Sequence, residues 1–349
     1  MNILIHSLVN LGDVVLSTGA AALIKENIPN AKITMMVRPI AREIVENNPV
    51  VDDFIIFDYK VKGKSLKQML VMIKTIKAKK FDVCFSFDRK LRPALVCFFA
   101  RIPQRVCAER IFDYKSSNIS LLYNNMIKMP EDFINNHQAD LFQEIIRKYF
   151  NITGFTKPVI GKITREHDYY ASKLVANMKK DKKIALCIKG TYYSKNWPIE
   201  KFIELINKIN NEFNVDFSIV GAKEDFEYAE DLISKTNIEI VNLCGKTSLL
   251  QYAALMKKID LLVTIDTGGM HVAATTNVPI VAIYRCVSTN RWRALSDKII
   301  AISSNFDDCN VSTFTTPEEC PGYYCVKDIE TEDVYSAILN YLKEKDIKE

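Results

Sequence analysis

Short apolar runs alternate with segments of helical periodicity along most of the chain. Residues 2–7 form a strand-like run, and residues 14–27 then show helical spacing. The alternation continues with predicted strands at 32–37, 54–57 and 83–87 and predicted helices at 40–47, 66–78 and 93–100. Strands that alternate with helices are typical of βα units. The pattern therefore predicts an α/β fold with a doubly wound parallel sheet.

The alternation pauses and then restarts. A predicted helix at 138–149 is followed by the polar stretch 151–158, which contains Gly and Pro and is typical of a connection. The second series has predicted strands at 183–188, 216–220, 238–242, 261–265 and 280–284 and predicted helices at 199–210, 226–234, 249–256 and 269–276. A last helical pattern covers 331–343, with Thr331 as the expected N-cap.

These series predict two Rossmann-like domains, at residues 1–155 and 156–330. Residues 331–349 are expected to form a C-terminal helix, and packing of this helix back on the N-terminal domain is left open. A length of 349 residues agrees with two domains. Ligands of open parallel sheets bind beyond the carboxyl ends of the strands, so two facing sheets predict a ligand cleft between the domains.

Composition excludes several classes of protein. A net charge of +5, without a recognisable nucleic-acid-binding motif, gives no support for nucleic acid as a partner. The first residues enter a strand pattern directly, without the features of an export signal. The densest apolar run, 94–100, is far shorter than the roughly 20 residues that cross a bilayer. Nine scattered cysteines, several within apolar strand-like segments, favour a reducing cytoplasm.

Lysines are concentrated in one stretch of the first half. They are Lys60, Lys62, Lys64, Lys67, Lys74, Lys77, Lys79 and Lys80. A solvated helix face is the ordinary explanation. The alternative is a surface near anionic lipid headgroups, which would mean peripheral contact with the inner face of the cytoplasmic membrane.

The first loop after a strand contains Gly12 and Asp13. It lacks the G-x-G-x-x-G arrangement that brings a backbone close to a dinucleotide, which disfavours NAD binding. Asp13 is either a structural acid at a helix start or a general base. Because the helix dipole favours the ionised carboxylate, a catalytic Asp13 would need burial against the acceptor.

The strongest motif is 263–271, in which a strand runs into two glycines and a helix. The amides of Thr267, Gly268 and Gly269 can approach an anion, such as the diphosphate of a nucleotide sugar. Asp266 ends the strand and is a candidate for holding sugar hydroxyls. His271 is a donor-site candidate by position, although a helix-packing role is the more common one for such a histidine.

Two further strand ends carry candidate donor-binding residues. Thr191 and Lys195 follow the strand at 183–188, and Lys195 can neutralise a leaving phosphate. The alternative is a surface lysine beside a helix capped by Asn196. Glu224 follows the strand at 216–220, where a carboxylate can accept ribose hydroxyls, or it is a first-turn helix acid.

Metal ligands and acceptor ligands are the last candidates. The chain contains no Asp-x-Asp, which favours a transferase without a metal, and no cofactor is expected. Cys309, Cys320 and Cys325 are weak evidence for a structural metal site, because their spacing is irregular and no histidine is near. Arg89, Lys90 and Arg92 follow a strand of the first half, where they suit the phosphate or carboxylate groups of an acidic acceptor. The alternative is that they are ordinary surface charges.

Four ordered motifs resemble those of glycosyltransferase family 9, the ADP-heptose:lipopolysaccharide heptosyltransferases. They are Leu11-Gly12-Asp13, Lys195-Asn196-Trp197-Pro198, the segment 242–249 and the segment 266–271. The resemblance implies a GT-B fold, inversion at the anomeric carbon and no metal. It also implies an ADP-sugar, such as ADP-heptose, as donor and a lipopolysaccharide inner core or similar acidic glycolipid as acceptor.

By the same resemblance, Asp13 is the base that takes the proton of the acceptor hydroxyl. Lys195 and the amides of residues 267–269 hold the diphosphate, Glu224 binds the ribose, and Asp266 binds the transferred sugar. The chain departs from the family pattern at Gly19, where proline is usual, and at Tyr284-Arg285-Cys286, where Phe-Gly-Pro is usual.

Other functions remain open from the sequence. A nicotinamide oxidoreductase shares the two-sheet architecture but needs the glycines that the first loop lacks. A non-catalytic nucleotide-sugar-binding protein would keep the phosphate loop and lose the base. A nucleotide-sugar 2-epimerase shares the fold and is the nearest enzymatic alternative.

Overall fold

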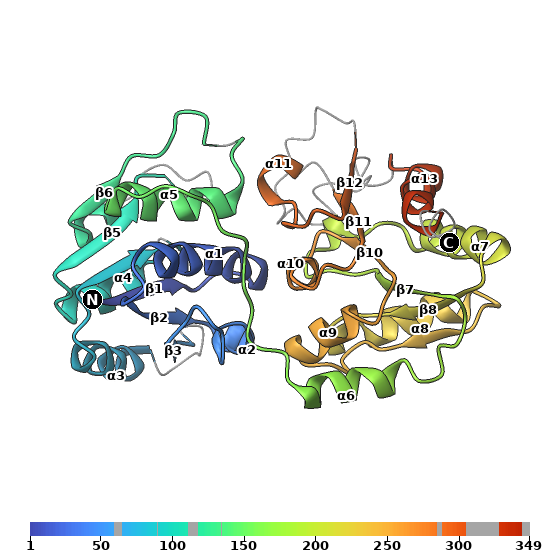
Figure 1. Ribbon diagram of the computed structural model, residues 1–349, viewed down its shortest axis with the longest axis horizontal. Helices are drawn as coiled ribbons and strands as arrows, with labels where there is room; N and C mark the ends of the chain where they lie inside the picture. The colour runs from blue at the N-terminus through green and yellow to red at the C-terminus, as the bar shows by residue number, and fades with distance from the viewer. Residues whose placement is uncertain are drawn as a thin grey trace. The chain divides into compact units, whose positions relative to one another are not determined.

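The computed structural model divides into two units, Met1–Lys162 and Ile163–Glu349. It describes residues 1–58, 65–88, 90–110, 118–133, 135–284, 288–304 and 328–343. Each unit contains a six-stranded sheet whose strand pairs are parallel (Figure 1). The predicted α/β fold with two Rossmann-like domains is confirmed. The boundary follows Lys162, whereas the sequence placed it after residue 155.

The first sheet has the strand order β3-β2-β1-β4-β5-β6, which begins with the order of a Rossmann fold. The strands are β1 (Asn2–Ser7), β2 (Lys32–Val37), β3 (Asp53–Ile56), β4 (Val83–Ser86), β5 (Gln104–Ala108) and β6 (Asn125–Ile127). The helices are α1 (Leu11–Asn27), η1 (Pro39–Ala41), α2 (Arg42–Val45), α3 (Ser65–Ala78), α4 (Leu91–Phe99), η2 (Asn118–Leu122) and α5 (Gln138–Phe150).

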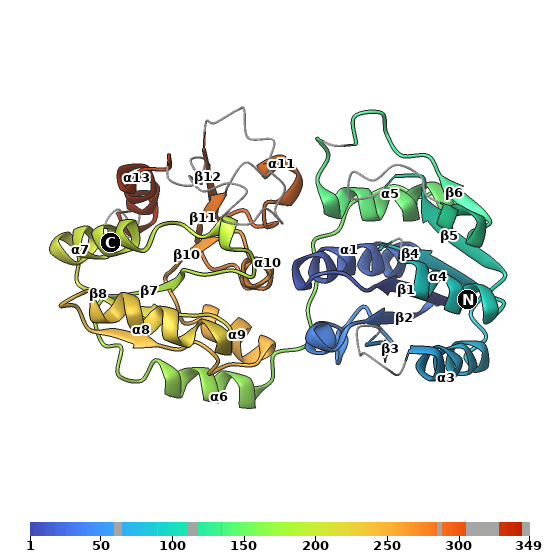
Figure 2. The ribbon, with the colours of Figure 1, turned by 180° about the vertical axis from the view of Figure 1, so that it is seen from behind.

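Alternating side chains of these strands bury two different helix layers. Leu4 and Cys84 lie in one apolar cluster with Val96 and Cys97 of α4, while α3 contacts α4. On the other face, Phe85 makes an edge-on ring contact with Tyr149 of α5, and α5 packs on α1. The two faces of the sheet thus carry α3 with α4 and α1 with α5 (Figures 1 and 2).

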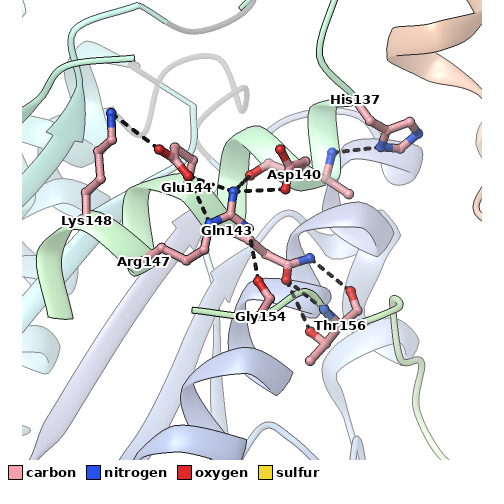
Figure 3. A network of polar contacts seen from close by, with 9 residues as sticks. His137, Asp140, Gln143, Glu144, Arg147, Lys148, Gly154 and Thr156 are labelled. Carbon is pink, nitrogen blue, oxygen red and sulfur yellow. Dashed lines mark hydrogen bonds and ion pairs between the residues drawn. The ribbon is translucent and has the colours of Figure 1, made fainter. Parts of the chain in front are cut away.

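The stretch 151–158, which the sequence predicted as an inter-domain connection, and the residue after it are hydrogen-bonded to the first unit. The side-chain amide of Gln143 on α5 donates to Thr156 O at 2.9 Å and accepts from Thr156 N at 2.8 Å (Figure 3). The amide of Val159 donates to Thr18 Oγ1 of α1 at 2.9 Å, and Asn48 donates to Val159 O at 2.8 Å. These bonds explain why the boundary lies after Lys162.

The second sheet has the order β12-β11-β10-β7-β8-β9. Its strands are β7 (Lys182–Cys187), β8 (Val215–Ile219), β9 (Ile240–Asn242), β10 (Leu261–Ile265), β11 (Ile280–Tyr284) and β12 (Ile299–Ser303). Its helices are α6 (Arg165–Leu174), η3 (Tyr193–Lys195), α7 (Ile199–Glu212), η4 (Lys223–Asp225), α8 (Phe226–Ser234), α9 (Leu249–Met256), α10 (Gly268–Ala274), α11 (Thr289–Trp292) and α13 (Thr331–Leu342).

Helix α13 packs inside the second unit. Val334, Ile338 and Leu342 belong to the apolar core that also holds α7, and the indole N–H of Trp197 donates to Ile329 O at 3.0 Å. The apolar face of α13 is therefore buried in the core that also holds α7. The N-cap is Glu330 and not Thr331.

Among the described residues, no helix combines the length and the apolar character needed to span a membrane.

Candidate active site

The carboxyl end of β10 is the centre of the second unit's candidate site. All residues of β10 are buried, because the strand lies between β7 and β11 in the middle of the sheet. The chain leaves the strand at Asp266, which is 7% exposed, passes the N-cap residue Thr267 and enters α10 at Gly268. The first amides of a helix have no partner within that helix, so they can bind an acceptor from outside.

Lys195 reaches this strand end from the neighbouring strand. Its ammonium group forms an ion pair with the Asp266 carboxylate, and both side chains are largely buried. Lys195 ends η3, two residues before Trp197, which is fully buried in the core of the unit. The anchored indole therefore positions the lysine, which is not the surface charge of the alternative interpretation.

The turn after β7 is held close to the turn after β10. Gly190 N donates to Asn196 Oδ1 at 3.0 Å, so Asn196 closes this turn and does not cap a helix. A Cβ atom at Gly190 would lie 3.3 Å from the Thr267 methyl carbon, which shows how closely the two turns approach. Thr191 lies on this turn with an exposed side chain. The two segments predicted to bind the donor thus lie next to each other.

The turn after β8 adds acidic and basic groups to this edge. Asp225 accepts from Ala222 N at 2.9 Å, and both Glu224 and Asp225 lie in the first turn of η4, so Glu224 has the first-turn position that the sequence left open. The Glu224 side chain is exposed. Lys189 lies 3.5 Å from the Asp225 carboxylate and donates to Glu224 O at 3.4 Å. Sequence reasoning gave Lys189 no role, although it directly precedes the glycine of the β7 turn.

Two other groups of the site are buried. His271 on α10 is 6% exposed, in agreement with the helix-packing role. Cys187 Sγ lies 3.9 Å from Thr267 Oγ1, and burial raises the pKa of this thiol. A thiol that stays protonated is a poor nucleophile, so the strand end offers hydrogen bonds and charge and not a covalent attack.

In the first unit, Asp13 lies in the first turn of α1 and is 9% exposed. The N-cap position is taken by Asn10, so Asp13 is not the cap. The neighbouring strand β4 leads to Lys90 and Arg92, both exposed at the start of α4. Because β1 and β4 are adjacent parallel strands, their carboxyl ends bring these groups to the same edge of the sheet. Arg89 lies outside the described residues.

A buried carboxylate that the sequence reasoning missed joins the two loops of this edge. Asp88 accepts from Leu8 N at 2.9 Å in the β1–α1 loop and from Lys90 N at 2.8 Å at the start of α4. It also contacts His6 Nδ1 at 3.0 Å, and both side chains are fully buried. Asp88 follows a strand in the sequence, which was the available signal.

Within the described ranges, no cluster of three or more His, Cys, Asp or Glu side chains has the arrangement of a metal site. Cys309, Cys320 and Cys325, the cysteines considered as a metal cluster, lie outside those ranges, as do Arg285 and Cys286.

Comparison with known proteins identifies the family. The model of glycosyltransferase family 9 (heptosyltransferase) matches residues 69–320. The chain belongs to glycosyltransferase family 9. A lipooligosaccharide heptosyltransferase 2 of Campylobacter jejuni is 25% identical over 354 residues, which cover 98% of this chain and 99% of the relative.

Solved structures agree with the fold. A family 9 glycosyltransferase from Veillonella parvula superimposes with a TM-score of 0.84 at 22% identity, covering 98% of this chain and 97% of that one. The structure of E. coli ADP-heptose LPS heptosyltransferase II superimposes with a TM-score of 0.80 at 20% identity, covering 99% of this chain and 100% of that one. The GT-B fold implied by the motifs is confirmed. The family 9 chain is a glycosyltransferase, which sets aside the oxidoreductase and 2-epimerase alternatives.

Proposed function

We propose that this glycosyltransferase moves a heptose or a related sugar from an ADP-sugar to a lipopolysaccharide inner core or similar glycolipid, with inversion and without a metal. The observation that carries the proposal is the Lys195–Asp266 ion pair at the carboxyl ends of β7 and β10. It puts a cation for phosphate and a carboxylate for sugar hydroxyls next to each other. A structural neighbour with this fold is named for ADP-heptose and LPS.

In this proposal the donor diphosphate binds where Lys195 now meets Asp266. Lys195 turns from the carboxylate to the phosphates, assisted by the amides of residues 267–269 and by Thr191. Asp266 then accepts hydroxyls of the transferred sugar, and the exposed Glu224 accepts the ribose hydroxyls. Negative charge grows on the leaving ADP, and each fixed donor aimed at it lowers the barrier by about 3 kcal/mol. This replaces the charge neutralisation that a divalent metal would supply.

Asp13 is the proposed general base. It takes the proton of the acceptor hydroxyl as that oxygen attacks the anomeric carbon, while the bond from this carbon to the phosphate oxygen breaks and ADP leaves. A single displacement of this kind inverts the anomeric configuration. At 9% exposure, Asp13 has little contact with bulk water, which suits a base that must receive its proton from the acceptor.

The acceptor is proposed to bind the edge of the first sheet that carries Asp13. Lys90 and Arg92 are exposed there and suit phosphate or carboxylate groups of an acidic glycolipid. Arg89 stays a sequence prediction for the same role.

A cytoplasmic location is part of the proposal. Cys84, Cys97, Cys107, Cys187 and Cys244, which are the cysteines in the described ranges, are all buried free thiols. Free thiols are the usual state in a reducing compartment.

A panel of ADP-, UDP- and GDP-sugars tests the donor. A ligand that binds only the folded protein raises its melting temperature, and a concentration of 100 times Kd adds about 2.7 kcal/mol of stability. We expect an ADP-sugar to give the largest rise in the melting temperature, with ADP-heptose foremost. A larger rise with a UDP- or GDP-sugar would contradict the proposed donor.

A further inference from the structure

Helices α3 and α4 carry an unusual number of exposed apolar side chains. Their inner sides are buried under the first sheet, as Ile76 and Val96 show. Of the twelve large apolar side chains exposed in the described parts of the chain, seven lie on α3, α4 and the adjoining η2. They are Leu66, Leu70, Val71, Leu91, Phe98, Phe99 and Leu121, with exposures from 40% to 82%.

The spacing gathers these side chains on the outer faces of the helices. Leu66 and Leu70 are four residues apart on α3, and Leu91, Phe98 and Phe99 follow helical spacing on α4. Helix α3 contacts α4, and α4 contacts η2, so the exposed groups belong to neighbouring elements. Single exposed apolar residues are normal on a protein surface, but a gathered set marks an interaction surface.

The charge on the same helices has one sign. Residues 65–81 and 89–108 contain no Asp or Glu. Lys67, Lys74 and Lys77 are exposed on α3, and Arg101 is exposed directly after α4. The guanidinium of Arg105 lies over the Phe98 ring at 5.4 Å from its centre. Apolar side chains bordered by long basic ones are the composition of surfaces that rest in the headgroup region of a bilayer.

We propose that the outer face of α3, α4 and η2 is a docking surface for a bilayer that contains anionic lipids. The complementarity of the basic residues to anionic headgroups, together with the apolar side chains between them, favours this occupant. The proposal deepens the function proposed above, since a glycolipid acceptor is reached at a bilayer. Its test is independent of the transfer reaction.

The experiment is co-sedimentation of the full chain with vesicles of phosphatidylcholine, with or without phosphatidylglycerol. We expect binding to the vesicles with phosphatidylglycerol and much weaker binding to the neutral ones. Each lysine removed should weaken binding about fivefold at low salt, so Lys67→Gln with Lys74→Gln should act clearly more strongly than either change alone. Leu70→Asp with Phe99→Asp should reduce binding by at least about tenfold.

Matched controls lie in the second unit. Lys257→Gln removes an exposed lysine, and Tyr169→Asp changes an exposed aromatic side chain on α6. Neither should alter vesicle binding. The melting-temperature rise with an ADP-sugar, measured on every variant, reports that the fold and the donor site are intact. The vesicle-binding result stays valid even if none of the nucleotide sugars raises the melting temperature.

Equal vesicle binding by the wild type and the Leu70/Phe99 variant would overturn the proposal. So would absence of binding to vesicles with phosphatidylglycerol. Concentration-dependent self-association of the wild type that this variant abolishes would assign the face to a second copy of the chain and would also overturn it.

Discussion

Lys195 and Asp266 form an ion pair in which each charge compensates the other, and both side chains have little contact with water. The Lys195 side chain is 16% exposed and that of Asp266 only 8%. Removing one partner of such a pair leaves the other charge without compensation, which costs more than the pair itself contributes. A lone Asp266 carboxylate would in addition repel the diphosphate of the proposed donor.

Lys195→Met should therefore harm both donor binding and turnover. We expect kcat/KM for the ADP-sugar to fall by roughly two orders of magnitude, from the loss of one donor to the leaving group. Transfer kinetics and the melting-temperature rise with the donor measure the two effects. Lys208→Met is the control, because Lys208 pairs with Glu332 on the surface of the same unit. A Lys195→Met enzyme within twofold of the wild type would remove Lys195 from the donor site.

His6 and Asp88 form a buried pair at the carboxyl ends of β1 and β4. Burial alone would lower the pKa of His6, but the charge of Asp88 and the hydrogen bond to it raise the pKa above the usual 6.5. A group with a raised pKa in the folded state stabilises the fold fully below pH 6.5. This stabilisation is lost as the pH rises through the raised value.

The free energy of unfolding should accordingly decrease as the pH rises above 6.5, and His6→Gln should lack this part of the pH dependence. Urea unfolding of both proteins between about pH 5.5 and pH 9 measures the difference. The same slope in both proteins would mean that His6 is not charged in the fold.

At the scale of elements, Gly19 allows α1, α5 and the segment after α5 to meet. A Cβ atom at this position would lie 2.9 Å from both Gln143 Nε2 and the backbone oxygen of Thr156. Gln143 is held by two hydrogen bonds to Thr156 (Figure 3). The Thr156 hydroxyl also donates to Gly19 O. Neither neighbour can move without breaking a buried hydrogen bond. The glycine at position 19 thus has a packing reason.

Gly19→Ala should lower the free energy of unfolding by about 1–3 kcal/mol, the usual cost of overpacking. Helix propensity acts in the opposite direction, since alanine is favoured over glycine in a helix by about 1 kcal/mol. We expect the clash to outweigh this gain because one contacted atom belongs to the backbone. Denaturant unfolding decides the sign, and a more stable variant would show that propensity dominates.

The helices and strands that the sequence predicted well are those in which most residues of a strand, or one whole face of a helix, are buried. The central strands β1, β4, β7 and β10 are almost entirely buried and therefore appear as apolar runs. The sequence analysis missed β5, β6, α6, α11 and β12. Helix α6 buries only Ala171, and the outermost strand β12 is partly exposed, so their periodicity is weak.

The residues of the candidate site could be predicted from the sequence only in part, as could the secondary-structure elements. Lys195 and Asp266 were both expected in the donor site, because each follows a parallel strand and such strand ends share one edge. Three contacts depend on how the turns fold: the ion pair between Lys195 and Asp266, the ion pair of Lys189 with Asp225, and the hydrogen bonds of Asp88 to Leu8 N and Lys90 N. Sequence spacing does not determine those contacts.

At the scale of the whole molecule, the proposed reaction takes its donor residues from the second unit and its base from the first. Asp13 and the acceptor candidates Lys90 and Arg92 belong to Met1–Lys162, whereas Lys195 and Asp266 belong to Ile163–Glu349. Each unit has its own sheet and core, so a change in one site should leave the other intact. Binding of the donor and transfer of the sugar are therefore separable by mutation.

The most direct measurement is the release of ADP by the purified enzyme given ADP-heptose and a heptose-free inner-core glycolipid. We predict release that requires the acceptor and equals the sugar incorporated. Asp13→Asn should lower it by at least about a hundredfold while the donor still raises the melting temperature. Full transfer by Asp13→Asn, or no acceptor-dependent release by the wild type, would contradict the account.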